Sequence, residues 1–189
     1  MDHRVKLLLI VATTTGTPRV ATAQASGAVR CYYAALNAHD FQAMMSCYSP
    51  AAVTVRGSTR QPVDFEASRG YRQFEAATHA RFYFDLKSES DTTADTVLHE
   101  ESDFLRALGL TSVTADWFYV VRRGVIVEEH HTRADSLYGP KFREFVAWAR
   151  REQLPEWQNV IDPAGNVVFN GVTAKTLVAL ARRWASVRR

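Results

Sequence analysis

The sequence V-T-A-D-W-F-Y-V-V-R-R-G-V-I-V-E-E-H-H-T-R-A-D, residues 113–135, decides how the rest of the chain can be interpreted. Two arms rich in β-branched and aromatic residues meet at Arg123-Gly124, which is typical of a β-hairpin with a two-residue turn. The arms also concentrate ionisable side chains: Asp116 on the first, and Glu128, Glu129, His130, His131 and Arg133 on the second. We therefore expect this hairpin to carry both core residues and site residues.

The register of such a hairpin predicts one chemically useful pair. With a two-residue turn, Arg122 faces Val125, and continued pairing places Asp116 opposite His131, with Cβ atoms about 5 Å apart. A carboxylate beside an imidazole orients the ring and makes it a usable acid or base near neutral pH. The same register places Phe118 opposite Glu129.

Which face of the hairpin turns inward is left open by the sequence. Apolarity favours the face of Trp117, Tyr119 and Val121 as the core face, which would leave Asp116 and Phe118 outside. A slip of one residue in the turn would also break the pairing of Asp116 with His131.

The remaining elements predict an α+β fold. Helices are expected at residues 26–36, from residue 41 to about residue 48, and at residues 69–80, with a short strand at residues 52–56. The period then changes to two, and predicts four antiparallel strands at residues 81–90, 96–108, 111–122 and 125–134. Further helices are expected at residues 141–153 and 172–187. Helices first and a long meander afterwards specify helices packed on a curved sheet.

This order resembles the nuclear transport factor 2-like superfamily, which includes SnoaL-like polyketide cyclases and ketosteroid isomerases. Two stretches carry the resemblance: Y-Y-A-A-L-N-A-H-D-F-Q-A-M-M-S-C-Y-S-P-A-A-V-T-V at residues 32–55, and R-R-G-V-I-V-E-E-H-H at residues 122–131. The resemblance implies a cone-shaped barrel, formed by a curved, mostly antiparallel sheet that wraps on the N-terminal helices. The predicted domains are a signal peptide at residues 1–25, the barrel at residues 26–138 and a helical extension at residues 139–189.

The resemblance also implies a site, although not that of a ketosteroid isomerase. Tyr32 falls at the position of the isomerase's oxyanion-hole tyrosine and Asp116 at that of its oxyanion-hole aspartic acid, but Arg56 occupies the position of the base. The family geometry would turn Asp116 into the pocket, against the argument from apolarity. We thus expect Asp116, His131 and Tyr32 as catalytic residues. Substrate-binding residues are expected to be Arg56, Phe118, Glu129 and Arg133.

The N-terminus and the cysteines bear on the compartment. Arg4 and Lys6 precede a short apolar run and two overlapping A-x-A sites at residues 21–25, which is the pattern of a secretory signal peptide. We expect a secreted or periplasmic protein, or a cytoplasmic one if this segment is not a signal. Cys31 and Cys47 could form a disulfide, or could be two reduced core thiols.

Composition limits the function classes. The net charge of +3 on 189 residues gives no clustered basic face, so no nucleic-acid partner is expected, and no apolar run is long enough to span a membrane. No nucleotide-binding motif is present. A set of His99, Glu101 and His131 lacks tight metal-ligand spacing, so we predict neither a metal nor a cofactor.

These observations predict a protein with a pocket for a small apolar or polyketide-like molecule. It could be a cofactor-independent isomerase, cyclase, dehydratase or hydrolase that uses the Asp–His pair for proton transfer. We also expect it to form a homodimer. The alternatives are an exported, dimeric binding module without catalysis, or a structural component of an assembly. Which of these applies depends on what the hairpin presents to the pocket.

Overall fold

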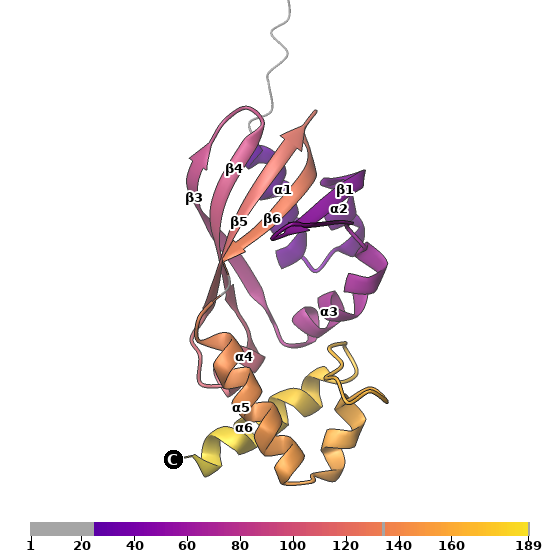
Figure 1. Ribbon diagram of the computed structural model, residues 1–189, viewed down its shortest axis with the longest axis vertical. Coiled ribbons are helices and arrows are strands. Elements are labelled where there is room, and N and C mark those ends of the chain that lie inside the picture. The colour runs from indigo at the N-terminus through magenta and orange to yellow at the C-terminus, as the bar shows by residue number, and fades with distance from the viewer. Residues whose placement is uncertain (1–24, 134, 189) are drawn as a thin grey trace, which may run out of the picture.

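The computed structural model describes residues 25–133 and 135–188, except for the side chain of Arg133. It has an α+β fold in which a curved, unclosed sheet lies against N-terminal helices, while further helices gather at one end of the sheet (Figure 1). The predicted signal peptide lies outside the described residues apart from Ala25, the first residue of α1. No helix in the described part of the chain is long and apolar enough to cross a membrane.

The elements follow one another in a helix-first order. They are α1 (Ala25–Asn37), α2 (Phe41–Ser46), β1 (Tyr48–Arg56), β2 (Thr59–Pro62), α3 (Phe65–Ala77), β3 (Arg81–Glu89), β4 (Thr93–Glu101), α4 (Asp103–Ala107), β5 (Val113–Arg122), β6 (Val125–Arg133), α5 (Tyr138–Arg151), the 3₁₀ helix η1 (Pro155–Val160) and α6 (Ala174–Val187). The six strands form one sheet in the order β2-β1-β6-β5-β4-β3. Strands β1 and β6 run parallel and all other neighbours antiparallel, so the sheet is mixed but mostly antiparallel, as expected.

The concave face of the sheet buries a core against α1. Val29 and Tyr33 of the helix pack with Tyr119, Val121 and Ile126 of the last hairpin. These side chains are almost wholly removed from water, and burial of each contributes roughly 1.5–3 kcal/mol. A polar contact at this depth joins the hydroxyl groups of Tyr33 and Tyr119, 2.9 Å apart. The helix is therefore fixed against the middle of the sheet.

A second core holds the C-terminal helices. Phe145 of α5 and Leu177 and Trp184 of α6 are buried together with Phe104 of α4 and Phe74 of α3. Since α3 and α4 belong to the sheet-forming part of the chain, this core joins the C-terminal helices to it.

Three segments differ from the elements predicted from the sequence. Two differ because a side chain caps the start of a helix, and one because of a tight turn. The strand expected at residues 96–108 ends at Glu101, because the Ser102 hydroxyl accepts a hydrogen bond from the Leu105 amide and begins α4. Helix α3 begins at Phe65 rather than at residue 69, because Asp64 caps it. Residues 57–62, for which no strand was predicted, form a turn at Gly57 (φ 59°) and strand β2.

A disulfide joins Cys31 of α1 to Cys47, the residue after α2, with their Cα atoms 6.0 Å apart. Closing this loop restricts the unfolded chain, which for a loop of this length stabilises the fold by about 3 kcal/mol. We expect Cys31→Ala/Cys47→Ala to lower the free energy of unfolding by that amount in urea denaturation. The wild-type protein in dithiothreitol should match the double variant. A loss below about 1 kcal/mol would show that the bridge constrains little.

Candidate functional site

The β5–β6 hairpin starts in the predicted register and then departs from it. Arg123 and Gly124 form the two-residue turn, both with positive φ, and Arg122 pairs with Val125. An extra residue in β6 then shifts the pairing, so that Tyr119 lies opposite Glu129 and Trp117 opposite His131. A second shift places Asp116 opposite Arg133. The prediction of an Asp116–His131 pair is wrong, because two β-bulges separate the turn from these residues.

The two faces of the hairpin are now assigned. Trp117, Tyr119, Glu129 and His131 face the concave side, as the argument from apolarity predicted. The placement of Asp116 in the pocket, which followed from the family geometry, is wrong: its carboxylate lies 3.6 Å from Lys87 Nζ, away from the pocket. The large rings of Trp117 and Tyr119 bury more apolar surface than the alternative face would, and this sets the orientation.

Two of the four expected substrate-binding residues, Phe118 and Arg133, are not found in the pocket lining. Phe118 lies on the outer face, where its ring contacts His130 edge-on at a centroid distance of 5.5 Å, so its expected place in the pocket is wrong as well. The backbone of Arg133 belongs to β6, but its side chain lies outside the described residues. Tyr32, Arg56, Glu129 and His131 do line the pocket.

The pocket has a volume of about 810 Å³ and lies on the concave side of the sheet, bordered by α1, β1, β2 and α3. Its wall is largely aromatic, with Tyr32, Tyr48, Phe65, Tyr71, Trp117 and Tyr138 among its lining residues. Polar side chains gather in two groups within it, one around Glu129 and one around Arg72. A mostly apolar cavity of this size with a few convergent polar groups is the usual form of a small-molecule site.

The first polar group, the Glu129 end, consists of Glu129, Tyr48 and Thr54. The Tyr48 and Thr54 hydroxyls each donate to one carboxyl oxygen of Glu129, both at 2.6 Å. The parallel pairing of β1 with β6 places Thr54 beside Glu129 and so fixes this contact. Tyr48 is buried, and desolvation raises the pKa of its phenol, helped by the nearby charge of Glu129. Tyr48 therefore remains a hydrogen-bond donor at neutral pH.

The second polar group, the Arg72 end, consists of Arg72, Glu75 and Glu100. Arg72 Nη1 donates to both carboxyl oxygens of Glu75, at 2.7 and 2.6 Å. Burial raises the pKa of Glu75 to about 8, although Arg72 acts in the opposite sense. Burial also raises the pKa of Glu100 to about 7, again against the effect of Arg72. One guanidinium serves two desolvated carboxyl groups, so this group holds a proton near neutral pH.

Three further residues line the pocket besides these two polar groups: Tyr32, Trp117 and His131. Burial raises the pKa of Tyr32 to about 12, with smaller effects from Arg72 at one end and Glu129 at the other. The indole Nε1 of Trp117 is buried and has no hydrogen-bond partner among the described residues. The ring of His131 stacks on Trp117, with centroids 4.9 Å apart. The pocket is therefore lined by a neutral phenol and by the stacked rings of Trp117 and His131.

Sequence reasoning missed the residues of the Arg72 end. In the strand, Glu100 lies between His99 and Glu101, so strand alternation places it on the opposite face from these two residues. In the helix, Glu75 follows Tyr71 by four residues and Arg72 by three, so all three lie on adjacent faces of α3. This i, i+4 relation to an aromatic residue was the available signal for a buried Glu75.

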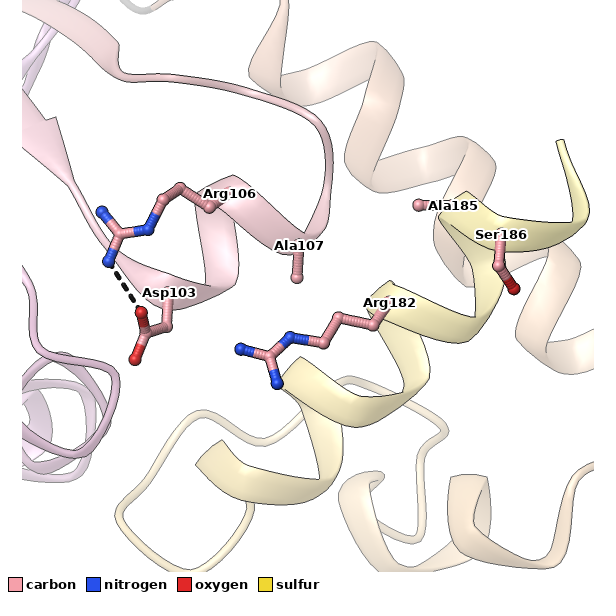
Figure 2. A pocket seen from close by; sticks show the side chains of 6 residues that line it. All are labelled: Asp103, Arg106, Ala107, Arg182, Ala185 and Ser186. Carbon is pink, nitrogen blue, oxygen red and sulfur yellow. Dashed lines mark hydrogen bonds and ion pairs between the residues drawn. The ribbon is translucent and has the colours of Figure 1, made fainter. Parts of the chain in front are cut away.

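Two other places in the described part of the chain were candidates for a site. No group of three or more metal-ligating side chains occurs among the described residues, and His99 pairs with Asp85 on the outer face, away from His131. A hollow of about 670 Å³ lies between α4 and α6 (Figure 2). There Arg106 pairs with Asp103 at 2.7 Å and Arg182 extends toward them, both arginines being exposed, so this hollow lacks an apolar enclosure.

Comparison with known proteins found similar solved structures only. The fold and the site together define an α+β protein with a pocket on the concave side of its sheet. No protein-family model matches the sequence, and no curated protein matches it. Similar solved structures include a nuclear transport factor 2-like protein of unknown function from Cytophaga hutchinsonii, with 15% identity, a TM-score of 0.43, and 61% of this chain and 91% of that chain covered.

Two other solved structures give similar values. A candidate polyketide cyclase from a Silicibacter species is 14% identical, with a TM-score of 0.41 and 62% of this chain and 92% of that chain covered. The protein Bal32a, from a soil-derived mobile gene cassette, is 13% identical, with a TM-score of 0.46 and coverage of 62% and 93%. At these identities and TM-scores no activity can be transferred, and the site must be interpreted from its own residues.

Proposed function

We propose that this protein binds a small, largely apolar molecule in the concave pocket and transfers a proton on it without a cofactor. The observation that carries the proposal is Glu100, a half-buried carboxyl at the pocket wall with a pKa raised to about 7 by burial. A group with this pKa exists in both protonation states at neutral pH, as a general acid or base requires. Within the described residues, Glu100 has no hydrogen bond or ion pair of its own, so it is available to a ligand.

The surroundings of Glu100 support the same chemistry. Arg72 lies close enough to influence its pKa, and it would stabilise negative charge that develops on a substrate oxygen. Tyr32 offers a hydroxyl donor in the same cavity. These roles replace those expected for Asp116 and His131 in the sequence.

The test is hydrogen–deuterium exchange at the carbon next to the carbonyl group of small aryl ketones, followed by NMR in D₂O. We expect the wild-type protein to accelerate exchange above buffer, and Glu100→Gln to reduce that acceleration at least tenfold, because the amide cannot take up the proton. The matched control is Glu101→Gln, the next residue along β4 and outside the pocket lining. Equal rates for Glu100→Gln and wild type would remove Glu100 from the mechanism.

A binding module without catalysis is the second candidate, and the tyrosines favour it. Burial raises the pKa values of Tyr32, Tyr33 and Tyr119 well above neutral, so these phenols cannot exchange protons readily at pH 7. Mass spectrometry of the purified protein would then detect a copurified apolar molecule, and no ketone in the exchange panel would react faster than in buffer.

Export and dimerisation belong to the same proposal. The disulfide between Cys31 and Cys47 supports an oxidising compartment, in agreement with the signal peptide expected at residues 1–25. Tyr83, 48% exposed on β3, stacks on His99 on the outer face of the sheet and supports a contact there with a second copy. Mass spectrometry of the mature N-terminus and light scattering test these two points.

A further inference from the structure

Glu129 is a carboxylate that the protein holds with neutral donors. Its two oxygens accept hydrogen bonds from the hydroxyls of Tyr48 and Thr54, and both bonds measure 2.6 Å. An ionised carboxylate is an acceptor only, so two hydroxyl donors suit a negative charge at this position. The cavity around it has mostly aromatic walls.

No cation of the described chain neutralises that charge. Glu129 forms no ion pair with any described side chain, a set that leaves out Arg133, in contrast to its neighbour Glu128, which pairs with Arg60 on the outer face. Of the two arginines in the pocket lining, Arg72 is bound at both carboxyl oxygens of Glu75, and Arg56 is exposed at the end of β1. A carboxylate has about four acceptor positions, so Glu129 retains free ones.

Aromatic rings surround the Glu129 end of the pocket. The Tyr32 and Tyr48 rings meet edge to face at 5.2 Å, and Tyr48 meets Phe65 in the same way, also at 5.2 Å. Trp117 contributes a fourth ring from β5. Ring faces carry partial negative charge and attract organic cations, above all alkylated ammonium groups, whose own hydration is weak.

We propose that the Glu129 end of the pocket binds the ammonium group of an organic amine or quaternary ammonium compound, with Glu129 as counter-ion and the rings of Tyr32, Tyr48, Phe65 and Trp117 as the cage. This inference rests on the proposed function, since it names the class of molecule that the pocket accepts. The aromatic wall alone would predict a neutral ligand, whereas Glu129 predicts a ligand with a positive charge.

The opposite end fixes the orientation of such a ligand. Arg72 would repel an ammonium group there, and it instead favours an oxygen that gains negative charge. The ligand class is thus an amine with an apolar body and, at its far end, a polar group such as a carbonyl near Glu100. The ammonium and the reacting carbon then occupy different ends of the cavity.

The experiment compares two probes of nearly equal shape, phenyltrimethylammonium and its neutral carbon analogue tert-butylbenzene. Binding to the wild-type protein is measured by quenching of tryptophan fluorescence at pH 7. We expect phenyltrimethylammonium to bind at least tenfold more tightly. Equal affinities would overturn the inference while leaving the proposed function intact as binding of neutral molecules. Absence of binding by either probe would overturn both.

Variants locate the effect at Glu129. We expect Glu129→Gln to reduce the preference for the cation to less than threefold while retaining the affinity for tert-butylbenzene, because the amide keeps the shape and loses the charge. The control is Glu128→Gln, one residue away on the outer face, which should keep the full preference. A preference that persists in Glu129→Gln would contradict the assignment of Glu129 as counter-ion. The wild-type comparison decides the inference even if Glu129→Gln unfolds.

Discussion

Arg72→Met is expected to destabilise the protein strongly, and more so as the pH rises. Removal of the guanidinium leaves Glu75, 3% exposed, without its ion-pair partner. Loss of one member of a buried pair costs about 3–5 kcal/mol when the remaining group is charged. At pH 9 we expect a loss of this size in the free energy of unfolding, measured by urea denaturation.

The pH dependence follows from the direction of the pKa shifts. In the folded protein, burial raises the pKa of Glu75 to about 8 and that of Glu100 to about 7, above the value of 4.5 for an unshifted glutamic acid. Protonation of these groups therefore favours the folded state, and their contribution to stability falls as the pH rises from about 4.5 to 8. At pH 5 Glu75 is protonated with or without Arg72, so Arg72→Met should then cost only about 1 kcal/mol.

The matched control is Arg69→Met on the same helix. Arg69 pairs with Glu66, also three residues away, but both side chains are exposed. Such a surface pair contributes less than about 1 kcal/mol, so this variant should change little between pH 5 and pH 9. If both variants cost the same at both pH values, Glu75 is not the buried titrating group that the structure indicates.

Local patterns predicted most of the element order, without β2 and α4, and also the inward face of β5 and the two-residue turn of the last hairpin. Trp117, Tyr119 and Val121 form one face of β5, whereas the opposite face carries Asp116 beside Phe118 and Val120, so the first face is the more apolar one. In contrast, the partner of Asp116 depended on pairing that continues over seven residues from the turn. Two bulges intervene, and a bulge leaves no mark that side-chain alternation within one strand can reveal.

The candidate site shows a similar division. Tyr32 and Glu129 were expected in the pocket and line it, because each belongs to an element that the pattern and the family resemblance placed correctly. Arg72, Glu75 and Glu100 were missed, because charged residues on a helix or strand are usually solvated. Only the tertiary packing of α3 over the end of β4 desolvates these carboxyl groups, and desolvation is what makes them chemically distinctive.

The second large effect is expected in the C-terminal helices, with Trp184→Ala. Leu177, Leu180, Ala181 and Trp184 form one buried face of α6, within the helix predicted at residues 172–187. Trp184 is 3% exposed and its ring lies 6.0 Å from that of Phe145. Truncation of a tryptophan in such a core costs about 3–5 kcal/mol, partly from lost burial and partly from the cavity that remains.

This variant also tests whether residues 139–189 form an extension that unfolds separately. The core around Trp184 includes Phe74 of α3 and Phe104 of α4, so we expect one cooperative transition, with far-ultraviolet circular dichroism and tryptophan fluorescence changing together. Val187→Ala is the control, because Val187 lies on the same helix, is 63% exposed and should change stability by less than about 0.5 kcal/mol. If Trp184→Ala instead unfolded in two separate transitions, and only the first came at a lower urea concentration than in the wild type, the C-terminal helices would be an independent unit. In that case α3 would hold Arg72 and Glu75 in place without support from the C-terminal helices.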